Sequence, residues 1–252
     1  MGTDPLAVTW WGHASTTVEI AGRRVAIDPL LTNHLFHLRR YAVAPHDSAV
    51  DADVVLVSHL HHDHCHLPSL ARVAPDVPVL LPRGGERLLR GRHDVRPVQP
   101  GDELDVAGVH VTVLPAHHDG RRLPWSRYRG PALGFRVTSG DRSFWYPGDT
   151  GTEVDLRAVG PVDLALVPVG GWGHSLGDEH LDPDQAADLV GDVGAHWAVP
   201  VHWGTFFPRG LAVVARRTHQ HMFVTPGERF AAAMVGRGAE AVVLEPGERF
   251  VP

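Results

Sequence analysis

The 252-residue chain has one cysteine and no long apolar segment, and each of these shortages excludes a class of protein. The single Cys65 rules out a disulfide framework and a cysteine-rich zinc site, and it suits a reducing compartment. No apolar run approaches the roughly 20 residues of a membrane span. The start, MGTDPLAVTWW, lacks the basic and apolar regions of a signal peptide. We therefore expect a cytoplasmic protein with no transmembrane segment.

Positive charge is also in short supply. The 23 Lys and Arg residues stand against 29 Asp and Glu, which gives a net charge of −6 with neutral histidine. Nucleic-acid binding depends on a basic face that releases counterions, so we expect no nucleic-acid partner. Histidine, in contrast, is abundant, with 19 residues. Because imidazole is the commonest neutral metal ligand, these residues either lie scattered over the surface or converge in part on a metal.

Short apolar runs bounded by glycine turns predict a β-rich chain. The expected strands are 8–11, 16–20, 24–28, 54–58, 77–81, 108–114, 132–138, 143–147, 163–168, 197–202 and 241–244. A faint repeat of strand, glycine turn, strand and acid links 16–29 with 132–149, which fits two related halves packed face to face. No linker separates the halves, so we expect one domain over residues 1–252. The final PGERF at 246–250 is interpreted as a tail.

Helices are expected at 68–73 and 85–90, and two further helices have clear start signals. Asp182 and Thr225 each precede a proline, and Gln or Glu follows three positions after each of them. This is the pattern of a capping box, in which the two side chains satisfy free backbone N–H groups of the first turn.

The expected strand at 54–58 is followed at once by HLHHDHCH. Within it His59, His61, Asp63 and His64 form the pattern His-x-His-x-Asp-His. A strand that ends in a turn can direct alternate side chains to one point and the next residues to a second point nearby. Nitrogen ligands with one carboxylate suit Zn, Fe, Ni or Mn, with zinc the default for a histidine-rich site. The alternative, a solvated histidine run, leaves the preceding strand and the aspartate unexplained.

One strand end cannot complete two coordination spheres, so further ligands are expected where other strands end. His117 and His118 end one such strand, Asp149 a second and His202 a third. Each alone has an ordinary explanation, since a strand-terminal aspartate often caps a turn and a single histidine is usually a surface or core residue. Because polar residues follow three strands in succession, we expect them along one edge of the sheet, which favours a shared site.

These residues resemble those of the metallo-β-lactamase superfamily. Within it they are closest to the branch of N-acylphosphatidylethanolamine phospholipase D and the ascorbate-6-phosphate lactonase-like hydrolases. The blocks that indicate this branch are WGHAST (11–16), IDP (27–29), PAHH (115–118), YPGDTG (146–151), DLALVPVGG (163–171), EHLDP (179–183) and VHWGTF (201–206). The resemblance implies an α/β (α+β) fold of four αββα layers, with two mixed β-sheets face to face and helices outside.

The resemblance also implies two divalent metal ions, zinc by default, with Mn, Ni and Fe as alternatives. The implied ligands of one ion are His59, His61 and His118. Those of the other are Asp63, His64 and His202, with Asp149 bridging the two. His117 remains the alternative to its neighbour, because the choice rests on family spacing after Pro-Ala.

A hydrolase with a binuclear centre follows from this ligand set. Two metals roughly 3.5–4 Å apart can share a bridging hydroxide whose pKa falls to about 7, and either ion can stabilise the charge that develops on the substrate. Asp63 and Asp149 then serve catalysis as ligands. His180 resembles an active-site histidine of the branch and is a candidate for substrate contact or proton donation, as is His174. A surface histidine in the first helical turn is the alternative for His180.

Asp28 and His13 lie in family blocks but outside the ligand set. We expect Asp28 to accept the N–H of a ligand imidazole, because such partners fix the tautomer and orientation of the ring. Local turn hydrogen bonds are the alternative for both. Cys65 follows His64 directly, yet the implied ligand set is complete without it, so we interpret it as a bystander.

Two segments are candidate walls of a substrate pocket. In DGRRLPWSRYRG (119–130), Arg121 and Arg122 suit phosphate or carboxylate and Trp125 suits a ring or apolar group, which predicts a small anionic substrate. An exposed loop with solvated arginines is the alternative. The second segment, 31–45, offers an apolar lid. Its expected members are Leu35, Phe36, Leu38 and Tyr41.

The predicted activity is hydrolysis of a phosphodiester, a phosphorylated lactone or a related ester. The nearest alternative is a lactonase or carboxylic ester hydrolase whose substrate has no phosphate. An iron-dependent redox enzyme and a non-catalytic scaffold of the same fold are the others. The branch often forms oligomers, so a homo-oligomer is also an expectation, although no patch in the sequence locates its interface.

Overall fold

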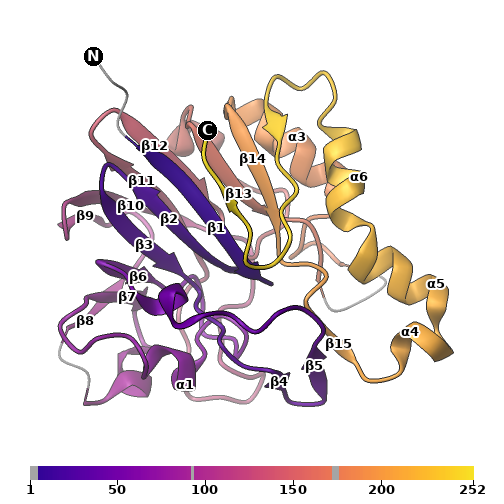
Figure 1. Cartoon of the computed structure of the whole chain (residues 1–252). Coiled ribbons are helices and arrows are strands. Elements are labelled where there is room, and N and C mark those ends of the chain that lie inside the picture. Colours follow the sequence, from indigo (N-terminus) through magenta and orange to yellow (C-terminus); the bar gives the residue numbers. More distant parts are fainter. Residues whose placement is uncertain (1–4, 92–93, 172–175) are drawn as a thin grey trace.

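Two seven-stranded β-sheets form the centre of the computed structural model, which describes residues 5–91, 94–171 and 176–252 (Figure 1). In spatial order the first sheet consists of β17 (Arg249–Phe250), β1 (Leu6–Gly12), β2 (Ser15–Ile20), β3 (Arg23–Ile27), β6 (Val54–Leu56), β7 (Val79–Pro82) and β8 (Val95–Val98). The second consists of β16 (Glu240–Ala241), β14 (Trp197–Val201), β13 (Leu164–Pro168), β12 (Arg142–Tyr146), β11 (Leu133–Ser139), β10 (Val109–Pro115) and β9 (Glu103–Val106). Each sheet is antiparallel on one side and parallel on the other, the change falling at β3 and at β12.

A third, small sheet joins two segments that are far apart in the sequence. Its strands are β15 (Phe206–Pro208), β5 (Leu38–Arg40) and β4 (His34–Leu35). Strands of two or three residues are too short to show a period, so the sequence did not predict them. The pairing of β15 with β5 fixes the segment 31–45 beside the chain that follows His202.

The helices are short apart from α3 (Pro183–Val193) and α6 (Pro226–Ala233). The remaining α-helices are α1 (Leu67–Leu70), α2 (Leu156–Val159), α4 (Leu211–Val214) and α5 (Arg216–His219). Two 3₁₀ turns, η1 (Asp47–Val50) and η2 (Glu86–Leu89), and one π-helical turn, η3 (Gln220–Val224), complete the described elements. No helix of the described residues is long and apolar enough to cross a membrane.

Alternation along β6 shows why both faces of the first sheet are covered. Val54 and Leu56 point into the core between the two sheets, whereas Val55 and Val57 pack with Leu70 of α1 on the outer face. On the other side, α3 and α6 cover the outer face of the second sheet (Figure 1). The predicted four-layer sandwich of two mixed sheets with helices outside is therefore confirmed.

The strands that precede the predicted site residues all run in one direction within their sheets. In the first sheet β1 and β3 each lie antiparallel to β2, and β6 lies parallel to β3. In the second, β10 and β12 lie antiparallel to β11, and β13 and β14 continue parallel to β12. The carboxyl ends of these strands therefore lie along one edge of each sheet, the position where α/β sheets place their ligands.

The carboxyl-terminal PGERF corrects the interpretation as a tail. The chain turns at Gly247, whose φ of +95° suits glycine, and Arg249–Phe250 then pair with β1 as the edge strand of the first sheet. The expected strand 241–244 is correspondingly short, since only Glu240–Ala241 pair with β14. An edge strand with open hydrogen-bonding groups attracts such a partner, but a two-residue pairing has no sequence signature.

Of the two predicted capping boxes, one is present. The Asp182 carboxylate accepts from Gln185 N at 2.9 Å, and the Gln185 side chain accepts from Asp182 N at 3.0 Å. Thr225 makes no such bond, because the chain before it is already π-helical and its hydroxyl donates to Gln220 O instead. The prediction for Thr225 was wrong because the helix does not start from extended chain there.

This difference predicts unequal costs for two alanine substitutions. Asp182→Ala removes a cap from α3 and should lower the free energy of unfolding by about 1 kcal/mol. Thr225→Ala removes no cap and should cost only about a few tenths of that. Urea unfolding followed by circular dichroism measures both, and equal losses for the two variants would contradict the assignment.

Candidate metal centre

Seven side chains predicted as metal ligands meet at this edge of the sandwich. They are His59, His61, Asp63, His64, His118, Asp149 and His202. The chain after β6 of the first sheet contributes four of them, and the chain after β10, β12 and β14 of the second sheet contributes one each. All lie in groups whose donor atoms are within 4.8 Å of one another, so the cluster is able to hold metal.

The first donor group contains three imidazoles. His59 Nε2 lies 2.9 Å from His61 Nδ1, and His61 Nδ1 lies 3.2 Å from His118 Nε2. The other ring nitrogen of His118 faces the carbonyl of Glu179 at 3.3 Å, and that of His59 lies 3.1 Å from Ser58 Oγ. These outer contacts orient the rings of His118 and His59 with the remaining nitrogen towards the group.

The second donor group contains Asp63, His64 and His202 together with His13, and the carboxylate of Asp149 lies beside it. His64 Nε2 lies 3.3 Å from both His202 Nε2 and Asp149 Oδ2, and the latter two atoms are 3.2 Å apart. Asp63 Oδ2 lies 3.5 Å from His64 and 3.8 Å from His202. Ligands about 2.1 Å from a tetrahedral zinc ion lie about 3.4 Å from each other. The separations among His64, His202 and Asp149 match this spacing, so these three side chains are able to share one ion.

Asp149 adjoins both groups, since it also clusters with His59 and with His118. Its Oδ1 is buried and has no hydrogen-bond partner among the described residues. A buried carboxylate oxygen without a partner is costly unless a cation is beside it. This orphaned oxygen, together with the donor types, fits the divalent metals that the fold family implies.

The protonation of the cluster points to the same need for positive charge. Burial lowers the pKa of His59 and His61, so both rings are neutral, the form that binds metal. Burial also acts to lower the pKa of His202, but Asp149 raises it to about 9. For His64 the carboxylates of Asp149 and Asp63 likewise outweigh burial and raise its pKa well above the ordinary value. A bound cation would compensate the same carboxylates.

Asp28 makes the contact predicted for it. Its Oδ2 accepts from His64 Nδ1 at 2.8 Å, from Ser58 Oγ at 2.6 Å and from Tyr146 OH at 2.7 Å, while Oδ1 accepts from Ser58 N at 2.8 Å. The side chain is fully buried. Because a carboxylate only accepts, it holds the proton of His64 on Nδ1 and leaves Nε2 for the cluster.

His13, expected in a family block but outside the ligand set, lies within the second donor group, a placement that the sequence did not predict. Its Nε2 donates to Asp63 Oδ2 at 2.8 Å, and its ring lies 4.1 Å from that of His202. Its backbone carbonyl accepts from His202 N, and its N–H donates to Thr205 Oγ1. The signal was the WGHAST block itself, whose histidine has a left-handed backbone at φ +53°, as His202 does at +65°. Such strain concentrates at functional sites.

The remaining predicted histidines are placed less uniformly. His180 Nδ1 lies 3.8 Å from Asp149 Oδ2, is buried and has no hydrogen-bond partner among the described residues. Burial lowers its pKa to about 4, so the ring is neutral near pH 7. His117 is absent from the donor groups found among the described residues, so the geometry favours His118. His174 lies outside the described residues, and Cys65 is buried with its pKa raised to about 11 by burial.

The two arginines predicted to bind an anion are bound to the protein instead. Arg121 donates to both carboxylate oxygens of Asp119 and does not line the cavity beside the cluster. Arg122 is buried, and its guanidinium donates to Leu60 O, Cys65 O and His62 Nδ1. It therefore braces the loop that carries the His-x-His-x-Asp-His motif. Trp125 is exposed on the surface.

A cavity of about 590 Å³ opens beside the cluster and is mostly apolar. His61 and Asp63 lie in its wall, where the two donor groups meet it. The other walls come from the predicted lid, from the loop after His118 and from residues 208–223, which the sequence did not indicate. Their apolar members are Leu35, Phe36, Leu38, Leu123, Pro124, Pro208, Leu211, Met222 and Phe223. Tyr41 is not a wall residue, because it stacks on Phe207 at 3.8 Å.

Comparison with known proteins supports the family that the sequence motifs predicted. The sequence model of the beta-lactamase superfamily domain matches residues 23–203. The chain therefore belongs to the beta-lactamase superfamily, as its motifs predicted. On the family, the fold and the cluster of imidazoles and carboxylates, it is a metal-dependent hydrolase of the metallo-β-lactamase fold.

Three similar proteins illustrate the relationship. The metal-dependent hydrolase MK1542 of Methanopyrus kandleri is 28% identical over 263 residues, covering 97% of this chain and 99% of the relative. N-acyl-phosphatidylethanolamine-hydrolyzing phospholipase D 1 of Caenorhabditis elegans is 28% identical over 80% of this chain and 64% of its own length. Igni18, a metallo hydrolase from Ignicoccus hospitalis, has a TM-score of 0.74 and 20% identity over 98% of both chains.

The role of Asp28 can be tested through metal retention. In Asp28→Asn an amide NH₂ replaces one carboxylate oxygen and cannot accept hydrogen bonds from His64, Ser58 or Tyr146. The proton of His64 is then no longer held on Nδ1, and the metal affinity should fall roughly 10- to 100-fold. Elemental analysis during titration with a chelator measures this. Asp105→Asn, in an exposed pair with His110 at 2.9 Å, is the matched control and should retain metal like the unmodified protein. Equal retention by the Asp28 variant would refute the role.

Proposed function

We propose that the chain hydrolyses an ester, a phosphodiester or lactone among the candidates, with a binuclear metal centre and an apolar substrate group in the adjoining cavity. The observation that carries this proposal is the pair of donor groups that meet at Asp149 beside an apolar cavity. His59, His61 and His118 would hold one ion, and Asp63, His64 and His202 the other. When bound, two such ions lower the pKa of water and polarise the bond to be cleaved.

The protein groups around the centre hold its ligands in place. His202 Nδ1 donates to Gly170 O at 3.0 Å, which directs Nε2 to the cluster, just as Asp28 directs the ring of His64. His13 holds the Asp63 carboxylate from the opposite side. With these partners fixed, the ligands need little rearrangement to bind metal, and preorganised charge of this kind is the main source of catalysis.

His180 is proposed to contact the substrate. Its unpartnered Nδ1 lies beside Asp149, where a reacting group would sit. A ring with a pKa of about 4 carries no extra proton near pH 7, so it can donate or accept a hydrogen bond but holds no acid proton to transfer. This favours the contact role over proton donation, the other role considered for it.

The cavity favours a substrate with an uncharged apolar arm. Arg122 is the charged wall residue beyond the cluster itself, and its guanidinium is committed to backbone carbonyls. An anionic group would have no free cation there among the described wall residues, whereas an aliphatic or aromatic group would gain contacts with nine apolar side chains. A carboxylic ester without phosphate, or a phosphodiester whose charge lies at the metals, satisfies this wall.

Removing the shared carboxylate tests the centre. Asp149→Asn should lower the hydrolysis rate by more than about a hundredfold, because the carboxylate proposed to bind both metal ions is lost. Matched phosphodiester and carboxylic esters with the same apolar arm serve as substrates, and Asp105→Asn as the control. Undiminished hydrolysis by the Asp149 variant would rule out the proposed centre.

Filling the cavity tests the substrate arm. Leu123→Trp places a larger side chain in the wall and should raise KM roughly tenfold for a long-chain ester, since a few buried methylenes contribute that much binding. An acetate ester of the same alcohol should show an unchanged KM. Steady-state kinetics on both esters decides, and a rise shared equally by the two would contradict an apolar site here.

A further inference from the structure

Large apolar side chains lie in solvent on, or next to, the segments that line the cavity. Phe36 is 71% exposed, Trp125 81%, Val213 84% and Val214 83%. Each belongs to, or directly adjoins, a segment that lines the cavity: 35–38, 122–124 and 208–223. Soluble proteins rarely gather so much exposed apolar surface without a partner for it. The helix α4 is the extreme case, since none of its four residues is buried.

The three longer stretches of chain that contain these segments have an unusual charge. Residues 31–45, 121–130 and 205–226 contain nine arginines and no aspartate or glutamate. The rest of the chain carries the other 14 basic residues and all 29 acidic ones. Six of the nine arginines are exposed: Arg39, Arg127, Arg129, Arg209, Arg216 and Arg217. An acidic protein thus presents a basic, apolar face around its cavity, which the net charge of −6 conceals.

We propose that this face, formed by residues 31–45, 121–130 and 205–226, docks on an anionic lipid surface. Exposed aliphatic and aromatic groups enter the boundary between headgroups and acyl chains, while arginines around them meet the lipid phosphates. The charge of the face matches such a surface, and the acidic remainder of the molecule is repelled from it. An apolar substrate arm would then pass from the lipid into the cavity without crossing water.

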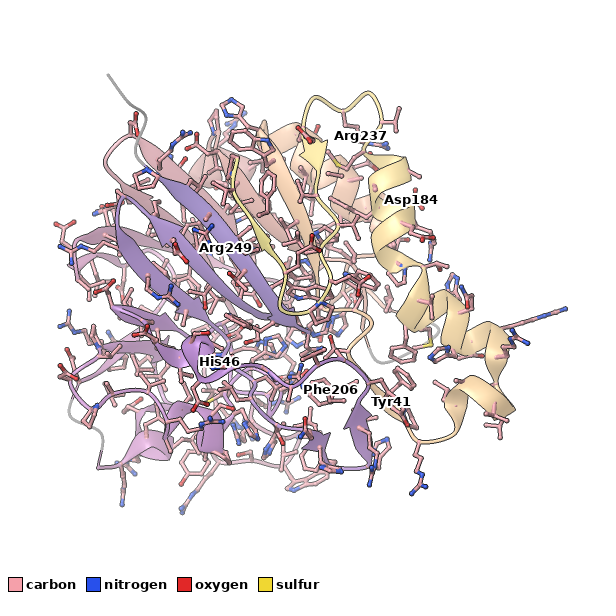
Figure 2. All side chains as sticks on the ribbon, viewed as in Figure 1. Tyr41, His46, Asp184, Phe206, Arg237 and Arg249 are labelled. Atoms are coloured by element: carbon pink, nitrogen blue, oxygen red, sulfur yellow. The ribbon has the colours of Figure 1, made fainter. Side chains whose placement is uncertain are left out.

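A second copy of the chain fits this face poorly. A symmetric dimer through it would set one group of exposed arginines against the same group of its partner. Like charges facing each other across an interface cost several kcal/mol in general, so the charge that favours lipid opposes self-association here. In Figure 1 the face includes β4, β5, β15, α4 and α5, and in Figure 2 the exposed Tyr41 marks it, whereas Asp184 and Arg237 lie towards the other end of the helix layer.

Vesicle sedimentation tests the proposal on the full chain. The unmodified protein should bind vesicles of phosphatidylcholine mixed with phosphatidylglycerol, bind phosphatidylcholine alone far less, and dissociate in high salt. Each basic residue near an anionic surface contributes roughly a fivefold gain in binding. Arg216→Glu combined with Arg217→Glu should therefore weaken binding at least about tenfold. Val213→Ser combined with Val214→Ser should also weaken it.

Val235→Ser is the matched control, because Val235 is 81% exposed and lies beyond the end of α6 that is remote from α4. It should bind vesicles like the unmodified protein. Substitutions at such exposed positions cost little stability, so all variants should remain folded. Absence of binding to anionic vesicles, or binding that the α4 and α5 variants leave unchanged, would overturn the proposal.

A single label identifies the occupant of the face. The native Cys65 is buried, so a polarity-sensitive dye would react at Val213→Cys, or at Val235→Cys as the control. The emission at position 213 alone should shift to the blue when anionic vesicles are added. A shift that grows with protein concentration without vesicles would assign the face to a second copy. A shift with polyglutamate and not with vesicles would assign it to an acidic protein, and either result overturns the proposal.

Hydrolysis of a water-soluble ester by the same preparations separates this proposal from the proposed function. The α4 and α5 variants should hydrolyse it at the unmodified rate, because none of the altered residues belongs to the donor groups. Vesicle binding without hydrolysis would leave the docking face in place and refute the function. Hydrolysis without vesicle binding would leave the proposed function in place and refute the docking face.

Discussion

The carboxylate of Asp28 is buried between the two sheets and accepts four hydrogen bonds. Ser58 donates two of them from the end of β6, and Tyr146 donates one from β12 in the opposite sheet. Burial raises the pKa of Tyr146 well above its ordinary value, so its hydroxyl remains a donor. The fourth bond comes from His64, in the metal cluster. One buried carboxylate therefore joins both sheets and orients a ligand, and removing any of its partners would leave it with fewer of the hydrogen bonds that offset its burial.

The pairing of the sheets has a counterpart in the sequence repeat. The hairpin of β2 and β3 leads to Asp28, and that of β11 and β12 leads to Asp149, with a parallel strand beside each. The two aspartates have different surroundings. Asp28 has four donors, whereas Asp149 keeps one buried oxygen without a partner among the described residues. Two hairpins of similar strand pairing thus end in aspartates with different roles: Asp28 is fully hydrogen-bonded, whereas Asp149 keeps this oxygen, which a metal ion could bind.

The sequence predicted the long strands, whose apolar residues alternate, and the polar side chains that follow their ends. Strand alternation and glycine turns located the long strands, and the strand ends located the cluster, because ligands must leave the sheet at one edge. It did not reveal β4, β5 and β15, whose two or three residues show no period, nor the return of Arg249 to β1. The pairing of Arg121 with Asp119 was equally hidden, since an arginine that binds an anion and one that binds its own loop look alike in sequence. His13 was visible in its motif, but its reach to Asp63 depends on a left-handed backbone that only the structure shows.

The metal cluster, the substrate cavity and the proposed docking face follow one another from the core to the surface. The cluster lies at the sheet edge, the apolar cavity adjoins it, and the basic, apolar face surrounds the mouth of the cavity. The proposed hydrolysis depends on two ions occupying the donor groups. Anomalous X-ray diffraction from metal-loaded crystals, recorded on both sides of the zinc absorption edge, tests that most directly. The account predicts two peaks about 3.5–4 Å apart, one among His59, His61 and His118 and one among Asp63, His64 and His202, with Asp149 between them. A single peak, or peaks elsewhere in the molecule, would contradict it.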